Sequence, residues 1–217
     1  MMQLYHYYRS STSFRVRIAL NLKNIAYELK SVHLLNNGGE HLTPAYKALH
    51  PQGLVPCLAV CEPGQPPYFL TQSLAIIEYL EERFPAPSLL PTDPWARAKV
   101  RAFAQAIACE MHPLNNLRVL QYLKKNLALS EANKQSWYHH WLAEGFGALE
   151  QSLPGTGPYC FGETPTVADL CLIPQVWNAL RFDFSLADYP LIQKIYAHCL
   201  KHPAFDRALP ENQPEGG

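Results

Sequence analysis

The chain has 217 residues, a length that suits one large domain or two domains of about 100 residues each. Lys plus Arg and Asp plus Glu both number 18, so the formal net charge is zero, and this balance argues against a nucleic-acid partner or an anionic membrane surface. The N-terminus lacks a basic stretch followed by an apolar core, and no apolar run reaches the length of about 18 residues that a membrane span needs. The sequence therefore predicts neither a secretory signal nor a membrane span.

Residues 1–84 show alternating strand and helix patterns. The aromatic run 4–8 has strand composition, and the apolar residues Phe14, Ile18 and Leu22 that follow it recur at helical spacing. The expected elements are a strand over 3–8, a helix over 13–24, strands over 27–32 and 54–60, a short helix over 44–49, a hairpin strand over 68–70 and a helix over 74–84. A β-α-β unit followed by a hairpin and a helix predicts a small α/β sandwich.

The junction between the first strand and the first helix carries four hydroxyl residues, Ser10, Ser11, Thr12 and Ser13. All four are good N-caps, and such a junction directs free backbone N–H groups and the positive end of the helix dipole at one point. This makes it a candidate site for stabilising a thiolate or a carboxylate. The competing interpretation is an over-capped helix start with a solvated Arg9.

The segment 85–94 holds four prolines, which cannot continue a helix, and it is expected to be a linker. From residue 95 onward only periods of about 3.6 are found, so the second half is expected to be all-helical. The expected helices cover 97–127 with an interruption at Pro113, 132–153, 166–180 and 191–200. Thr166 and Asp169 form a predicted capping box, and the tail 210–217 is expected to be frayed.

Six cysteines are scattered along the chain without a Cys-x-x-Cys pair. This usage favours reduced, mostly buried thiols and a cytoplasmic protein over a disulfide framework. The nearest approaches to a metal-ligand spacing are His139 with His140 and His198 with His202, and neither has a matching motif. No metal site is predicted.

The order of these features resembles the cytosolic glutathione transferases over essentially the whole chain. The segment 9–18, RSSTSFRVRI, is similar to the signature of the zeta class, and the segments 72–81 and 166–176 are similarly diagnostic. Members of this class are maleylacetoacetate isomerases, and their bacterial relatives include maleylpyruvate isomerases. The run 112–116 followed by Arg118 is closer to the bacterial branch. Thr12 stands where many zeta-class enzymes carry a cysteine. This difference argues against transferase side activities more than against isomerisation.

The resemblance implies a fold of α/β plus all-α class. It comprises a thioredoxin-like glutathione-binding domain over 1–84, the linker over 85–94 and an all-helical substrate-binding domain over 95–217. Glutathione is the implied cofactor. The implied glutathione-binding residues are Ser10, His41, Val55, Pro56, Gln72, Ser73, His112 and Asn116.

Several of these residues have a specific expected role. Val55 would pair with the cysteinyl main chain of glutathione as an added strand, and Pro56 is expected to be cis. Gln72 and Ser73 precede a helix, where a carboxylate is favoured, although both also suit a plain N-cap. A lone histidine such as His41 or His112 is otherwise explained as surface or core filler.

The implied catalytic residues are Ser10, Ser11 and Thr12, with Ser10 as the first choice to hold the sulfur. The sequence does not decide which of the three hydroxyls does so, and capping alone remains the other interpretation of Ser10. The implied substrate is a maleyl keto acid with two acidic ends, which requires placed cations.

Arg9, Arg118 and Arg181 are the candidates to bind that substrate, because arginine binds carboxylates through a planar fork. A solvated Arg118 and a structural ion pair for Arg181 are the alternatives. Arg17 is expected to be structural. Arg15 lies two residues before it on the same helix, so the side chains of Arg15 and Arg17 cannot lie on the same helix face.

Two other functions share this scaffold: a general conjugating transferase or dehalogenase, and a binding module without enzymatic activity. The intact Ser10, Pro56, Gln72 and Ser73 argue against the binding module. The resemblance also implies a homodimer in which the α/β half of one chain packs on the helical half of the other.

Overall fold

The computed structural model describes residues 1–216, which form two compact units. The first unit comprises residues 1–88 together with the C-terminal segment from Leu200, and the second comprises residues 89–199. The division falls inside the segment 85–94 that the sequence predicts as a linker. Within residues 1–216, no helix is both long enough and apolar enough to cross a membrane.

The C-terminal segment differs from the sequence prediction, which placed it in the helical domain. The buried Arg17 guanidinium donates from Nε and Nη2 to the carbonyl oxygen of Ala208, at 3.0 and 2.9 Å. Asn21 donates to the carbonyl oxygen of Ala204 at 3.0 Å. These contacts join residues more than 180 positions apart in the sequence, so local patterns carry no trace of them.

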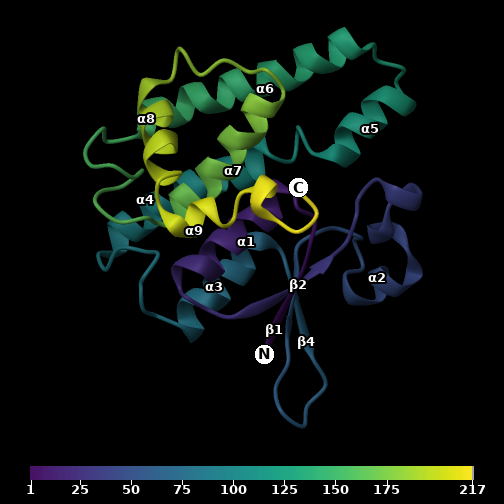
Figure 1. Ribbon diagram of the computed structural model, residues 1–217. Helices are drawn as coiled ribbons and strands as arrows, with labels where there is room; N and C mark the ends of the chain where they lie inside the picture. The colour runs from purple at the N-terminus through teal and green to yellow at the C-terminus, as the bar shows by residue number, and fades with distance from the viewer. Residues whose placement is uncertain (217) are drawn as a thin grey trace. The chain divides into compact units, whose positions relative to one another are not determined.

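The first unit contains one four-stranded sheet (Figure 1). Its strands are β1 (Met2–His6), β2 (Tyr27–Ser31), β3 (Cys57–Val60) and β4 (Tyr68–Thr71), in the order β2-β1-β3-β4. The central strand β1 runs parallel to β2 and antiparallel to β3, and β3 runs antiparallel to β4. The four predicted strands are confirmed: three are shorter than predicted, and β4 extends one residue further, to Thr71. The third begins at Cys57, because Pro56 has no N–H to donate to the ladder.

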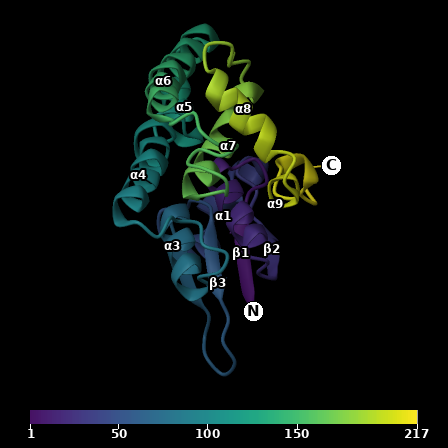
Figure 2. The same ribbon diagram turned by 90° about the vertical axis from the view of Figure 1, so that its left-hand side faces the viewer.

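Helices cover both faces of this sheet. On one face, α1 (Ser11–Leu22) packs against α3 (Ser73–Arg83), as Figure 2 shows. The side chains of Leu4, Phe14, Ile18, Ile77 and Leu80 are buried in this unit. The other face carries α2 (Pro44–Leu49) and a smaller apolar cluster of Tyr7, Val32, Tyr46 and Val55. The predicted α/β sandwich is confirmed.

The second unit is helical, as predicted. Its elements are α4 (Pro94–Gln105), a π-helical segment η3 (Ala106–Met111), α5 (Leu117–Lys125), α6 (Glu131–Ser152), α7 (Val167–Arg181) and α8 (Pro190–Cys199). α4 packs on α7, and α6 packs on the π-helical segment and on α8. The sequence did not predict the π-helical segment, because a period of 3.6 residues describes only the α-helix.

The capping box at the start of α7 is confirmed. The Asp169 carboxylate accepts the backbone N–H of Thr166 at 2.8 Å and the Thr166 hydroxyl at 3.1 Å. It also accepts the N–H of Cys160 at 2.8 Å, which ties the preceding loop to the helix. Burial raises the pKa of Asp169, and these hydrogen bonds oppose the rise.

The prediction of a frayed tail is wrong for residues 210–216, and Gly217 lies outside the described residues. The short helix α9 (Pro203–Asp206) is followed by a 3-10 turn, η4 (Pro210–Asn212). The buried Gln213 side chain donates to the carbonyl oxygens of Arg207 at 2.9 Å and Leu209 at 2.8 Å. Two further 3-10 turns, η1 (Asn36–Gly38) and η2 (Glu40–Leu42), precede α2.

His6 is completely buried on β1, between Arg17 and the tail. Its Nδ1 lies 3.3 Å from Nη1 of Arg17, and since a guanidinium only donates, Nδ1 accepts. Its Nε2 lies 3.7 Å from Oε1 of Glu215. Burial, and then the charge of Arg17, lowers the pKa of His6 to about 3, so the imidazole is neutral in the folded protein.

We expect His6 to make the protein less stable in mild acid. Because the folded pKa lies below the unfolded value of about 6.5, the unfolded chain binds the proton first as the pH falls. This stabilisation is complete above about pH 7.5, and about 1.4 kcal/mol of it is lost between about pH 7.5 and about pH 5.5. The His6→Asn variant keeps a neutral acceptor and is expected to lose that part of the pH dependence in urea unfolding. Equal pH dependence in both proteins would contradict the prediction.

Candidate active site

The hydroxyl residues at the N-terminus of α1 form a directed hydrogen-bond relay. Ser10 is the N-cap, and its Oγ accepts the N–H of Ser13 at 3.3 Å. Thr12 Oγ1 lies 2.8 Å from Ser10 Oγ and 2.9 Å from the carbonyl oxygen of Val55. A carbonyl only accepts, so the Thr12 proton goes to Val55 and Ser10 donates its own proton to Thr12. The relay therefore runs from Ser10 through Thr12 to Val55. The third candidate hydroxyl residue, Ser11, lies between Ser10 and Thr12 in the sequence and is buried.

The loop before β3 is held from two sides. The Tyr46 hydroxyl donates to the carbonyl oxygen of Leu54 at 2.6 Å, and Thr12 donates to the next carbonyl, that of Val55. The Val55–Pro56 peptide bond is cis, which confirms the sequence prediction. A carbonyl oxygen has two lone pairs, so Val55 retains the capacity to accept a second donor.

The N-terminus of α3 has an unusual backbone. Gln72 has a φ of +70°, in the left-handed region that non-glycine residues rarely adopt, at a cost of about 1–3 kcal/mol. Such strain is typical of ligand-binding sites. The Gln72 side chain is exposed and donates from Nε2 to Oε1 of Gln52 at 3.2 Å.

Ser73 is the first residue of α3 and is buried, and its Oγ accepts from Nη1 of Arg15 at 3.3 Å. Arg15 is only 1% exposed. Within residues 1–216, its Nε and Nη2 atoms have no hydrogen-bond partner. Helix N–H groups, a hydroxyl and a buried cation thus meet at one helix terminus, which suits an anion.

The two remaining predicted residues of the first unit, His41 and Arg9, lie outside the relay. His41 lies in η2, and this turn contacts the loop before Val55 at Gly53. The contact is so close that a Cβ atom at position 53 would lie 2.8 Å from the His41 carbonyl oxygen. Burial, and then the charge of Lys47, lowers the pKa of His41. Arg9 is exposed, and its guanidinium lies over the Tyr8 ring, 4.9 Å from the ring centroid.

In the second unit, three predicted residues meet at the N-terminus of α5. Asn116 is the N-cap, and its Oδ1 accepts the backbone N–H of Arg118 at 3.2 Å. Its Nδ2 lies 3.3 Å from Nε2 of His112. The structure therefore brings His112 and Asn116 together, and the Arg118 side chain is exposed on the same helix.

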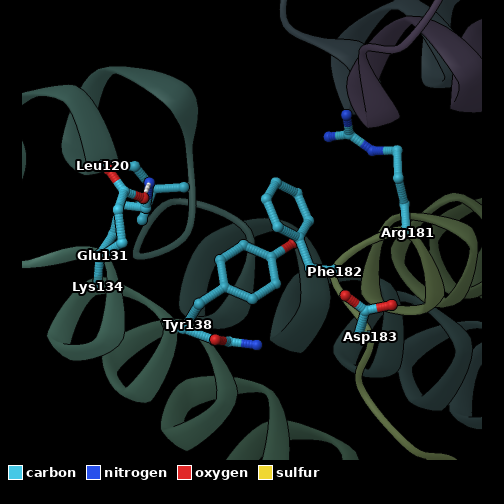
Figure 3. A pocket seen from close by; sticks show the side chains of 8 residues that line it. Leu120, Glu131, Lys134, Tyr138, Arg181, Phe182 and Asp183 are labelled. Carbon is cyan, nitrogen blue, oxygen red and sulfur yellow. Dashed lines mark hydrogen bonds and ion pairs between the residues drawn. The ribbon is translucent and has the colours of Figure 1, made fainter.

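A pocket of about 210 Å³ lies between α5, α6 and the C-terminal end of α7 (Figure 3). The Tyr138 and Phe182 rings lie 4.4 Å apart, between the Glu131–Lys134 ion pair and Arg181. Arg181 donates from Nη2 to Asn178 at 2.9 Å, and its guanidinium lies over the Phe182 ring at 4.6 Å. The complete lining is Leu120, Glu131, Lys134, Gln135, Tyr138, Arg181, Phe182 and Asp183.

This pocket contains one of the three predicted arginines. Arg181 lines it, whereas Arg118 does not, although Leu120 from the same helix does. Sequence reasoning missed Lys134, Tyr138 and Phe182. The available signals were the spacing of four residues between Lys134 and Tyr138 on one helix face and the position of Phe182 next to Arg181.

Burial disfavours the thiolate form of three cysteines, Cys57, Cys160 and Cys199. All six are free thiols, and burial raises the pKa of Cys57 to about 11. Cys160 and Cys199 are also buried, with pKa values raised mainly by burial. Residues 1–216 contain no group of three or more His, Cys, Asp or Glu side chains arranged to hold a metal ion.

An α/β unit with a hydroxyl relay at its first helix and an anion site at its third, followed by a helical unit, defines the class of the cytosolic glutathione transferases. Two family models match the chain: the glutathione S-transferase N-terminal domain over residues 4–88 and the C-terminal domain over residues 114–207. The chain belongs to the glutathione S-transferase family.

Relatives and solved structures cover nearly the whole chain. A probable maleylacetoacetate isomerase of Vibrio cholerae is 47% identical over 98% of this chain and 97% of its own. The holo structure of a bacterial zeta-class maleylpyruvate isomerase is 48% identical, with a TM-score of 0.92, and covers 99% of this chain and 100% of its own. A third match is the crystal structure of a maleylacetoacetate isomerase of Anaeromyxobacter dehalogenans with dicarboxyethyl glutathione and citrate in its active site. It is 38% identical with a TM-score of 0.89, and the match covers 100% of this chain and 94% of that chain. The resemblance to the zeta class is confirmed.

The residues of the first unit fit glutathione. The tripeptide offers a carboxylate at its γ-glutamyl end, a peptide main chain and a thiol. Ser73, with the guanidinium of Arg15 behind it, suits the carboxylate. The Val55 carbonyl suits a main-chain N–H, and the hydroxyls at the start of α1 suit the sulfur.

Proposed function

We propose that this protein is a glutathione-dependent cis–trans isomerase that converts a maleyl keto acid, maleylacetoacetate or maleylpyruvate, to the fumaryl isomer. The observation that carries the proposal is the Thr12–Val55 hydrogen bond, because it joins the hydroxyls of α1 to the loop that would pair with glutathione. The relatives named as maleylacetoacetate and maleylpyruvate isomerases, at nearly full coverage, support isomerisation over conjugation.

The first unit holds the cofactor through backbone and helix-terminal groups. Val55, which precedes Pro56, pairs with the cysteinyl main chain of glutathione as an added strand. Gln72 and Ser73 bind the γ-glutamyl carboxylate at the N-terminus of α3, where the helix dipole favours negative charge. His41, His112 and Asn116 are proposed to bind the remaining polar groups of the tripeptide.

Ser10, with Ser11 and Thr12, keeps the sulfur deprotonated. A free thiol has a pKa of about 8.5, and lowering it by two units requires about 2.7 kcal/mol of preferential interaction with the thiolate. One charge-assisted hydrogen bond contributes about 1.5–3 kcal/mol, and the N-terminus of α1 adds about 0.3–1 kcal/mol. A single hydroxyl together with the helix terminus is therefore sufficient.

Bound glutathione would supply the thiolate for reversible addition to the maleyl double bond, which would allow rotation about that bond and then release the thiolate unchanged. Arg9, Arg118 and Arg181 would bind the two carboxylates of the substrate, and an arginine or a backbone N–H donor would stabilise the negative charge that develops on the carbonyl oxygen. No proton is gained or lost overall, and the proposed chemistry requires no metal ion. Glutathione is regenerated in each cycle.

We expect glutathione to be required in catalytic amounts and to remain unconsumed while the ultraviolet absorbance of the maleyl compound changes. Steady-state kinetics with maleylacetoacetate and with maleylpyruvate identify the preferred substrate, because the two differ in the acyl part that the pocket must accommodate. Reactions without glutathione provide the control. Stoichiometric loss of glutathione would instead identify a conjugating transferase, and isomerisation at full rate without glutathione would contradict the mechanism.

We further propose that the chain forms a homodimer and acts in the cytoplasm. β4 exposes Tyr68 and Phe69, which are 57% and 39% accessible in the single chain, and such apolar residues suit an interface between subunits. The six free thiols suit a reducing compartment. Measurement of the native mass in solution tests the dimer.

A further inference from the structure

Arg15 is a buried cation whose hydrogen-bonding capacity is largely unused. Its side chain carries five N–H groups, and the residue is only 1% exposed. It makes a single hydrogen bond, from Nη1 to Ser73 Oγ at 3.3 Å, and within residues 1–216 its Nε and Nη2 have no partner. An isolated charge in the protein interior is costly, so this arrangement calls for a compensating anion.

Arg17, one half-turn further along α1, provides the contrast. It is equally buried, yet its guanidinium donates to the carbonyl oxygens of Ala208 and Tyr8 and lies 3.3 Å from the acceptor nitrogen of His6. Arg17 is therefore satisfied by the fold. Arg15 differs because its one partner is a hydroxyl at the N-terminus of α3, where an anion is favoured.

We propose that Arg15 is a positioning residue for the γ-glutamyl carboxylate of glutathione, acting through the Ser73 hydroxyl; this inference rests on the proposed function. Because the guanidinium only donates, it occupies a lone pair of Ser73 Oγ and leaves the hydroxyl proton free for the ligand. Its positive charge also lies behind the helix terminus that receives the carboxylate. The hydroxyl is thereby oriented and polarised as a donor, and the bound carboxylate supplies the missing counter-charge.

The test compares two ligands by isothermal titration calorimetry. One is glutathione, and the other is the glutathione analogue in which the γ-glutamyl carboxylate is a neutral amide. In Arg15→Gln, we expect the affinity for glutathione to fall about 10- to 100-fold, while the affinity for the amide analogue changes less than about threefold. Arg15→Lys keeps the charge and is expected to recover most of the preference for the carboxylate.

Arg17→Lys is the matched control, and we expect it to lower the melting temperature while leaving the ratio of the two affinities unchanged. If Arg15 has a purely structural role, Arg15→Gln lowers the affinity for both ligands by the same factor. This outcome overturns the proposal for Arg15 and leaves the proposed function standing. Failure of the wild-type protein to bind glutathione would instead overturn the proposed function itself. If Arg15→Gln does not fold, Ser73→Ala provides the test: because Arg15 acts through this hydroxyl, we expect the preference for the carboxylate to fall about tenfold, and an unchanged preference overturns the proposal.

Discussion

Replacing Ser10 with alanine is expected to lower kcat/KM for isomerisation about 100-fold and to raise the thiol pKa of bound glutathione by roughly one to two units. In the structure, Ser10 donates its only proton to Thr12, whose own proton is engaged by Val55. A thiolate competes for the Ser10 proton as a charged acceptor. Hydrogen bonds to charged groups contribute about 1.5–3 kcal/mol, against about 0.5–1.5 kcal/mol for neutral ones, so the proton turns toward the sulfur when glutathione binds.

The neighbouring hydroxyls provide the comparison for this prediction. Thr12→Val removes the competing acceptor while keeping the shape of the side chain, and we expect it to change kcat/KM less than about tenfold. Ser10→Gly removes the hydroxyl but keeps an acceptable N-cap, which separates the chemical effect from lost helix stability. The ultraviolet absorbance of the bound thiolate, followed against pH, reports the pKa directly. An unchanged thiol pKa in Ser10→Ala, with a raised one in Ser11→Ala, would transfer the role to Ser11.

Local sequence patterns predict the order of the strands and of the longer helices. The helical spacing of Phe14, Ile18 and Leu22 located α1, and the hydroxyls before it located the cap. The start of α1 at Ser11, two residues before the predicted one, follows from the same hydroxyls, since Ser10 already receives the N–H of Ser13. Patterns of this kind report short-range hydrogen bonding, which the local sequence largely determines.

Long-range contacts were not predictable in the same way. The Thr12–Val55 hydrogen bond spans 43 positions, and the Arg15–Ser73 bond spans 58. The sequence joined Ser10, Val55 and Ser73 into one site only through the family resemblance, and it left the role of Arg15 open. Since α1 and α3 pack together on one face of the sheet, Arg15 reaches Ser73 only after the tertiary fold has formed.

The second large effect is expected at Arg181. In Arg181→Ala we expect kcat/KM for the maleyl substrate to fall about 10- to 100-fold, mainly through KM, while the Kd for glutathione is preserved. Arg181 lines the pocket of the second unit, and its guanidinium is oriented by Asn178 and by the Phe182 ring. A carboxylate that loses a fork of two N–H donors loses both charge and geometry. Arg181→Lys keeps the charge alone and is expected to show an intermediate loss.

Arg118→Ala is expected to raise KM in the same direction but by a smaller factor, because Arg118 is exposed on α5 and does not line the pocket. Lys134→Ala distinguishes a direct contact from a general effect of positive charge. Lys134 lines the same pocket, but its charge is already paired with Glu131, so its removal should change KM least of the three. Steady-state kinetics at saturating glutathione give this ranking. If both arginine variants retain wild-type KM and kcat, neither residue binds the substrate carboxylates, and the cations that do so must be sought elsewhere in the chain.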